Sequence, residues 1–207
     1  MRVEGDFNAD GFAVVRRLAD PQVCERVLKQ LWVDLRQHGI PRVEHDARVV
    51  ARPALEVRGP DSPALSHFHW ASTAAIESVT GADLLPSCSH FRLYWGGDVC
   101  RVHSDRPVNQ VGVSLTLGYS DGLPWDLCIG SKPVSRAPPI TDDFGDEPYT
   151  ALKMEPGDAV LYRATRFRHG RIVPNPNRWS AHLLLMWVER GSEFENLAFE
   201  QLPDMFD

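Results

Sequence analysis

The stretch RLYWGGDVCRVHSD, residues 92–105, contains a β-strand, a tight turn and a pair of side chains that can bind metal. At its start, apolar and polar residues alternate with a period of two, which is typical of a half-buried strand, and this strand ends at Gly96-Gly97. Its last three residues are an H-x-D motif. The side chains of His103 and Asp105 point the same way if that segment is extended. The stretch therefore predicts a β-rich fold that places two polar ligands just after a strand.

A second histidine and an R-x-S motif follow further along the chain. His169 lies 64 residues after Asp105, and Arg178 lies nine residues beyond His169. An H-x-D motif alone is weak evidence, because it occurs by chance in many proteins of this size. Followed by a distant histidine and Arg178-x-Ser180, each at a strand end, it forms a specific pattern. Two imidazoles and one carboxylate leave three positions of a metal open, which suits non-haem Fe(II).

Period-two alternation predicts further strands after this stretch. The most regular covers residues 111–119, and the last strong one covers 179–188, where Arg178, Ser180 and His182 share one face. Shorter strands are expected at 124–129 and 159–162. Residues 131–149 hold four prolines and an acidic cluster, and this long loop is either an ordinary insertion or a lid over the site.

The first 86 residues have a different pattern. Apolar residues at helical spacing predict helices over 21–38 and from 62 to about 79, the first beginning at Asp20-Pro21. Short strands are expected at 12–16, 48–50 and 55–57. We therefore expect a mainly β fold with flanking helices, an antiparallel sandwich or barrel with the helices packed on one side.

Composition restricts the class of protein. The chain has 207 residues, with 22 Lys and Arg against 28 Asp and Glu, and a formal net charge of −6. This length predicts a single domain, 1–207, with a helical support region (1–86), a core (87–190) and an acidic tail (191–207). The acidic balance argues against a nucleic acid or a membrane surface as partner. No apolar run approaches the ~20 residues of a membrane helix, and the N-terminus lacks a secretory signal, so we expect a cytoplasmic monomer or homodimer.

Cysteines and basic residues add two expectations. The four cysteines are scattered without a C-x-x-C pair, which predicts reduced, buried thiols. Of the 22 basic residues, 19 are arginine. Four of them surround His169 in sequence and form either a solvated basic rim or a site for an anionic substrate: Arg163, Arg166, Arg168 and Arg171.

Together these segments resemble the Fe(II)/2-oxoglutarate-dependent dioxygenases with a double-stranded β-helix (jelly-roll, cupin-like) core, most of all the prolyl-hydroxylase-like and phytanoyl-dioxygenase-like branches. Residues 92–105 resemble the strand that bears a tyrosine and leads through glycine into H-x-D. Residues 155–162 resemble the turn and strand before the distal histidine, and 178–180 resemble the terminal R-x-S. The similarity covers residues 87–190, and residues 7–12 with the following helix fit the usual N-terminal extension. It implies an eight-stranded core.

The resemblance also implies roles for single residues. His103, Asp105 and His169 would be the iron ligands and the catalytic centre. Because Asp105 is present rather than a small residue that leaves room for a halide, hydroxylation or a related oxidation such as desaturation is implied. The expected products besides the oxidised substrate are succinate and carbon dioxide.

The same resemblance implies a binding site for 2-oxoglutarate. The planar guanidinium of Arg178 would bind its distal carboxylate in a bidentate way, and Ser180 would hydrogen-bond the same carboxylate. Tyr94 would contact the cosubstrate or the substrate. Candidates for contacts with a small, anionic substrate are Arg92, Arg163 and Arg171.

Three alternatives stay open at the level of sequence. A cupin-type metal enzyme that does not use 2-oxoglutarate has no need of the Arg178-x-Ser180 pair. A non-catalytic jelly-roll binding protein has no need of all three ligands. A peptide or protein hydroxylase has the same motifs as an enzyme that acts on a small or amino-acid-like molecule.

Overall fold

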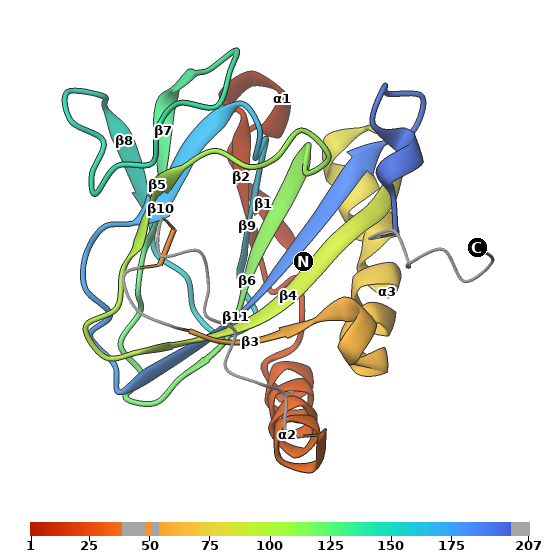
Figure 1. The fold of residues 1–207 in the computed structure, drawn as a ribbon, viewed down its shortest axis with the longest axis vertical. Helices are drawn as coiled ribbons and strands as arrows, with labels where there is room; N and C mark the ends of the chain where they lie inside the picture. The colour runs from red at the N-terminus through yellow and green to blue at the C-terminus, as the bar shows by residue number, and fades with distance from the viewer. Residues whose placement is uncertain (39–48, 51–53, 200–207) are drawn as a thin grey trace.

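The computed structural model describes residues 1–38, 49–50 and 54–199 (Figure 1). In this part of the chain, eleven strands form two antiparallel sheets. The larger sheet has the order β1-β2-β9-β6-β11-β4-β3, with strands Arg2–Glu4 (β1), Phe12–Arg16 (β2), Ala159–Tyr162 (β9), Val111–Tyr119 (β6), Trp179–Glu189 (β11), Leu84–Trp95 (β4) and Leu55–Arg58 (β3). The smaller sheet has the order β5-β10-β7-β8, with strands Cys100–His103 (β5), Phe167–Arg171 (β10), Leu127–Pro133 (β7) and Tyr149–Leu152 (β8).

Helices pack against the larger sheet. The long ones are α2 (Pro21–His38) and α3 (Pro63–Thr80), and α1 (Phe7–Asp10) is a single turn. Two 3-10 turns complete the described elements, η1 (Gly59–Asp61) and η2 (Glu195–Leu197). Figure 1 shows α3 alongside β4 and α2 below the sheet. None of the helices in the described ranges combines the length and the apolar character needed to cross a membrane.

The main core lies between these helices and the outer face of the larger sheet. Leu31 of α2 and Leu65 and Ile76 of α3 are fully buried there, together with Leu115 and Leu183 of the sheet. Burying side chains of this kind contributes about 1.5–3 kcal/mol each relative to exposure. The helices therefore stabilise the sheet from outside and leave its other face for the second sheet.

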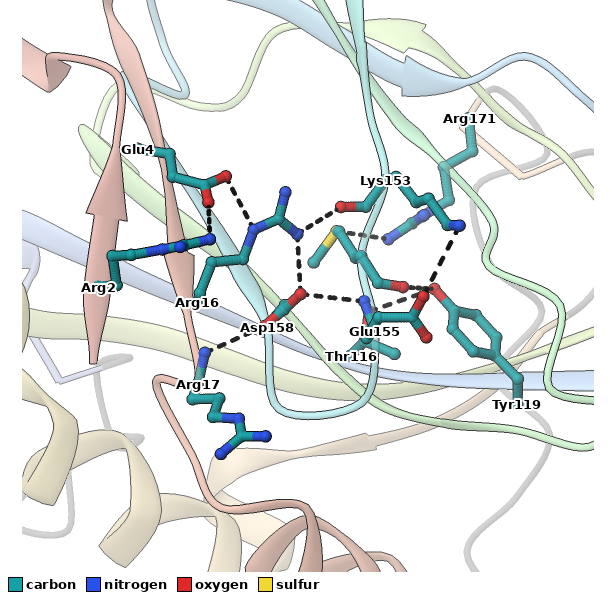
Figure 2. Close-up of polar contacts among 11 residues, drawn as sticks. Arg2, Glu4, Arg16, Arg17, Thr116, Tyr119, Lys153, Glu155, Asp158 and Arg171 are labelled. Atoms are coloured by element: carbon teal, nitrogen blue, oxygen red, sulfur yellow. Dashed lines mark hydrogen bonds and ion pairs between the residues drawn. The ribbon is translucent and has the colours of Figure 1, made fainter.

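A turn before β9 ties the N-terminal strands to this core. Gly157 adopts φ +91°, and a Cβ at this position would lie 2.3 Å from the carbonyl oxygen of Ala19, so only glycine fits. The next residue, Asp158, accepts hydrogen bonds from Arg16 Nη1 (2.8 Å) and the Arg17 amide (3.0 Å) (Figure 2). Arg16 lies at the end of β2, so this buried carboxylate fixes β2 beside β9.

The predicted fold class is confirmed, and four details differ. Strands β5 and β10 had no expectation of their own, and His169 lies inside β10 rather than after a strand. The strand expected at 124–129 begins and ends later, which shortens the loop expected at 131–149. The first 86 residues supply β2 and β3 as expected, and also β1, which had no expectation of its own. The strand expected at 48–50 lies partly outside the described residues, although Val50 forms a bridge with Cys100.

Candidate metal centre

Two neighbouring strands bring the three predicted ligands together. Strands β5 and β10 pair in antiparallel register, with His103 directly opposite His169. Asp105 follows β5, and its amide donates a hydrogen bond to the carbonyl of Ala164 (2.9 Å), which fixes the end of that segment. One ligand atom from each of the three side chains lies within 4.8 Å of the other two. The cross-strand pair thus places two imidazoles side by side, and the H-x-D spacing adds the carboxylate.

The backbone holds both imidazoles in the same orientation. His103 Nδ1 lies 2.7 Å from the carbonyl oxygen of Arg101, and His169 Nδ1 lies 3.0 Å from that of Phe167. A carbonyl oxygen only accepts, so each Nδ1 carries the proton and each Nε2 keeps its lone pair. This arrangement is typical of histidines that bind metal through Nε2.

The carboxylate of Asp105 lies between these two nitrogens. Its Oδ1 is 3.5 Å from His103 Nε2 and 3.6 Å from His169 Nε2. Burial raises the pKa of Asp105, but hydrogen bonding and charge from the two imidazoles, when their Nε2 atoms are protonated in the absence of a metal, outweigh burial and hold that pKa well below its usual range. Asp105 Oδ2 is buried and, among the described residues, has no hydrogen-bond partner. Two nitrogen lone pairs and an ionised carboxylate with a free oxygen fit a divalent metal and leave its other positions open.

The three side chains line a cavity of about 910 Å³ between the two sheets. The wall formed by β9 and β11 is largely apolar and includes Tyr162, Leu184 and Met186. The walls formed by β4 and β10 contribute Arg92, Tyr94 and Arg171. Of the predicted site residues, the cavity therefore brings together these three and the ligand set.

The arginine from β4 is already paired. Arg92 donates to Glu56 through Nε (2.9 Å) and Nη2 (2.8 Å), and Glu56 is fully buried on β3. Arg92 Nη1 also donates to the hydroxyl of Tyr94 (3.1 Å). Burial raises the pKa of Tyr94 far above its usual range, so its hydroxyl stays protonated. Glu56 was not predicted from sequence, although a lone carboxylate within the apolar strand 55–57 is a signal that could have found it.

The arginine from β10 has a different environment. Arg171 is 2% exposed and donates to the Trp125 carbonyl, to Ser114 Oγ (3.2 Å) and to His182 Nδ1 (3.3 Å). Its guanidinium lies over the Trp125 ring, 4.9 Å from the ring centroid. Trp125, Ser114 and His182 were not predicted as site residues; of these, only His182 gave a signal, through the alternation that places it on one face with Ser180.

Three other predicted residues lie outside this cavity. The Arg178 side chain is 80% exposed, and its Nε lies 3.2 Å from Asp121 Oδ1. Ser180 is buried, but its hydroxyl donates to Asn175 Oδ1 (2.7 Å). Arg163 stacks on Phe7 and donates to Asn8 Oδ1 (2.9 Å). Arg178 comes just before β11, at the open end of the strand, which explains why solvent surrounds its guanidinium.

The predicted basic cluster is divided in the same way. Arg168 pairs with Glu147 (3.0 Å) of the loop between β7 and β8, and Arg171 alone of the four lines the cavity. That loop also contributes Ile140 to the cavity wall, and its Phe144 is buried. All four cysteines are buried free thiols, as expected.

Comparison with known proteins supports the fold by structure and not by sequence. No protein-family model and no curated protein matches the chain. Among solved structures, a prolyl-4-hydroxylase from Pseudomonas putida has a TM-score of 0.63 at 16% identity, covering 90% of this chain and 96% of that one. HygX from Streptomyces hygroscopicus, with nickel and 2-oxoglutarate bound, has a TM-score of 0.65 at 13% identity, with coverage of 89% and 85%.

A third neighbour is the epimerase SnoN in complex with Fe³⁺, α-ketoglutarate and nogalamycin RO. It has a TM-score of 0.65 at 13% identity, covering 97% of this chain and 89% of that one. At these identities the likeness establishes the fold. The chain therefore has the jelly-roll fold of the 2-oxoglutarate-Fe(II) oxygenases, as the sequence predicts.

Proposed function

We propose that this protein is an Fe(II)- and 2-oxoglutarate-dependent oxygenase that hydroxylates an unactivated C–H bond of a small or amino-acid-like molecule. The observation that carries the proposal is the convergence of His103 Nε2, His169 Nε2 and the Asp105 carboxylate on one point of a large cavity. Solved structures with this fold hold iron or nickel and 2-oxoglutarate, which supports the same cofactors here. In the net reaction, substrate C–H, O₂ and 2-oxoglutarate give C–OH, succinate and carbon dioxide.

The chain's own residues would prepare the site for this chemistry. Bound Fe(II) would supply the centre at which O₂ is activated at the expense of the 2-oxo acid. His103 and His169 would each offer a neutral nitrogen, and Asp105 would offset one of the two positive charges of the metal. Tyr162, Leu184 and Met186 would exclude water from the reacting atoms.

The cavity also suits an acidic cosubstrate. Two buried guanidiniums line it: Arg92 is paired with Glu56, whereas Arg171 has no carboxylate partner among the described residues. Of the residues predicted to bind 2-oxoglutarate, Tyr94 lines this cavity, whereas Arg178 and Ser180 do not. We also propose that the substrate itself, which would bind in the same cavity beside 2-oxoglutarate, is anionic.

A metal enzyme that does not use 2-oxoglutarate is the second candidate. The exposed position of Arg178 favours it, since the predicted carboxylate-binding pair is not directed at the metal ligands. The prolyl-4-hydroxylase neighbour keeps a peptide substrate as a further candidate within the proposed class.

The test is an anaerobic titration of the protein with Fe(II) and then with 2-oxoglutarate, followed by visible absorption. Chelation of the 2-oxo acid by iron is expected to produce a charge-transfer band. His169→Ala should abolish the band, because it removes one of three ligands. His67→Ala, on the exposed side of α3, is the matched control and should leave the band unchanged.

The outcome separates the candidates. Iron binding without a band on adding 2-oxoglutarate would favour the cosubstrate-independent enzyme. A band that persists in His169→Ala would contradict the assigned ligand set. Release of succinate in air, accelerated by candidate metabolites or peptides, would then identify the substrate class.

A further inference from the structure

Arg171 is a buried cation that lacks a carboxylate partner among the described residues. Its contacts are a backbone carbonyl, the Ser114 hydroxyl, the His182 ring and the sulfur of Met154 (3.8 Å). Other arginines removed from solvent each face an acid: Arg92 pairs with Glu56, Arg168 with Glu147 and Arg16 with Asp158. A buried charge without a counter-charge costs several kcal/mol. An anion that enters the cavity would remove this cost.

The groups around Arg171 offer hydrogen-bond donors rather than acceptors. Because a guanidinium can only donate, His182 Nδ1 accepts from Arg171 and the proton of this neutral ring resides on Nε2. His182 Nε2 is buried and, within the described ranges, has no hydrogen-bond partner. The Tyr94 hydroxyl accepts from Arg92, so its own proton is available to a further acceptor. A carboxylate has only acceptor atoms, and it complements this set.

One aromatic ring connects these three donors. Arg171 lies over the Trp125 ring, Tyr94 meets the same ring edge-on with centroids 5.0 Å apart, and the His182 ring centroid is 6.0 Å away. Trp125 is 2% exposed and lies against all three groups. The donors therefore belong to one small region and are not scattered along the cavity.

The position of this region relative to the metal ligands fits a short dicarboxylic acid. Arg171 lies two residues after His169 on β10, a separation of roughly 6.6 Å along a strand. Both side chains line the cavity. A molecule held at the metal ligands by its 2-oxo acid end would therefore carry a carboxylate on a two-methylene chain toward Arg171.

We propose that Arg171, together with the hydroxyl of Tyr94, binds the distal carboxylate of 2-oxoglutarate, in place of Arg178. The strand that supplies the distal histidine would thus also supply the cosubstrate's counter-charge, and the exposed Arg178 would have no part in binding. This assignment rests on the proposed function, because it needs a 2-oxo acid at the metal.

The test compares two 2-oxo acids by calorimetry on the Mn(II)-loaded protein. 2-Oxoglutarate carries the distal carboxylate, and 2-oxopentanoate has the same number of carbons without it. Arg171→Gln should weaken 2-oxoglutarate binding by about 100-fold, the effect of removing one partner of a buried charge pair. Its affinity for 2-oxopentanoate and for Mn(II) should stay unchanged, which shows that the fold and the metal site are intact. Arg178→Gln is the matched control and should bind both acids as the wild type does.

Tyr94→Phe provides a second measurement should Arg171→Gln fail to fold. It should weaken 2-oxoglutarate about tenfold and leave 2-oxopentanoate unchanged, because only the hydroxyl is lost. Wild-type affinity for 2-oxoglutarate in Arg171→Gln, or in Tyr94→Phe when the first variant does not fold, would overturn the assignment. So would a loss confined to Arg178→Gln. Failure of the wild type to bind either acid with Mn(II) in place would overturn the proposed function as well.

Discussion

The two faces of β11 differ in their surroundings: one packs against the helices and the other faces the cavity. On one face, Leu183, Leu185 and Trp187 are fully buried against the helices. On the other, His182 contacts Arg171, and Leu184 and Met186 line the cavity. The first face is a continuous apolar layer, and the second mixes polar groups with a half-buried leucine. A single strand thus connects the main apolar core to the cavity that holds the candidate metal ligands.

The two faces of β11 differ in whether they contain polar groups without hydrogen-bond or ionic partners. The apolar face meets other apolar side chains and needs nothing more. The other face meets the guanidinium of Arg171, which has no carboxylate partner among the described residues, and includes His182, whose buried Nε2 has no hydrogen-bond partner there. Stability and binding can therefore be disturbed separately on neighbouring residues.

The largest difference in stability between the two faces is expected when the adjacent residues Leu183 and Leu184 are each replaced by alanine. Leu183→Ala removes a fully buried side chain and should lower the free energy of unfolding by about 3 kcal/mol. Leu184→Ala, the matched control on the cavity face, should lower it by only about 1 kcal/mol, because this residue is already half-buried. Denaturant unfolding measures both. Equal losses would mean that the cavity face is as tightly packed as the helical face.

A smaller effect concerns the pH dependence of the helical face. His69 of α3 is buried with its ring 4.5 Å from that of Trp187, and burial lowers its pKa from 6.5 to about 3. The unfolded chain therefore binds a proton near pH 6.5 that the folded protein does not bind until about pH 3. Stability from this group is complete above pH 6.5 and falls as the pH is lowered. Between pH 6.5 and 5 the loss is roughly 1.5 kcal/mol.

The His69 effect can be isolated with a matched pair on the same helix. His69→Gln should make the unfolding free energy of the metal-free protein less dependent on pH across this interval. His67→Gln replaces an exposed histidine and should leave the pH dependence as it is in the wild type. The same slope in all three proteins would show that His69 is protonated in the folded state.

The smallest effect is expected outside both faces. Arg178→Gln removes an exposed ion pair with Asp121 and should change the free energy of unfolding by less than about 0.5 kcal/mol. Thermal unfolding in the presence of Fe(II) should match the wild type. A change of several kcal/mol in the free energy of unfolding would mean that the residue just before β11 contributes to packing of the core.

Much of the architecture could be predicted from local patterns. Residues 21–38 repeat apolar positions at helical spacing after an Asp-Pro start, and residues 111–119 alternate without interruption; both elements appear with the predicted bounds. Strand β5 alternates over only four residues, and β10 is short and largely polar, so neither stands out as a strand in the sequence. They form because β10 pairs with β5 on one side and with β7 on the other. Such pairing is a property of the folded chain and not of a sequence window.

The same distinction between local pattern and tertiary contact applies to the candidate site. That His103, Asp105 and His169 lie together could be predicted from type and spacing, because metal binding needs particular atoms from few positions. The position of a long side chain depends on its neighbours. Arg178 follows the same alternation as Ser180, yet Asp121 draws its guanidinium outward, and Arg171 is held inside by the carbonyl of Trp125. These partners lie about 50 residues away in sequence, so spacing along the chain could not reveal them.

The cross-strand pairing of His103 with His169 also bears on folding. A metal held by both histidines would close a loop that contains β6, β7, β8 and β9 between its ends. Closing so long a loop restricts the unfolded chain, and binding only to the folded state adds its own free energy. Amide hydrogens of the four-stranded sheet should therefore exchange with solvent more slowly when metal is bound. An ion held by the three ligands would thus act as a removable cross-link between β5 and β10, two strands that are far apart in the sequence.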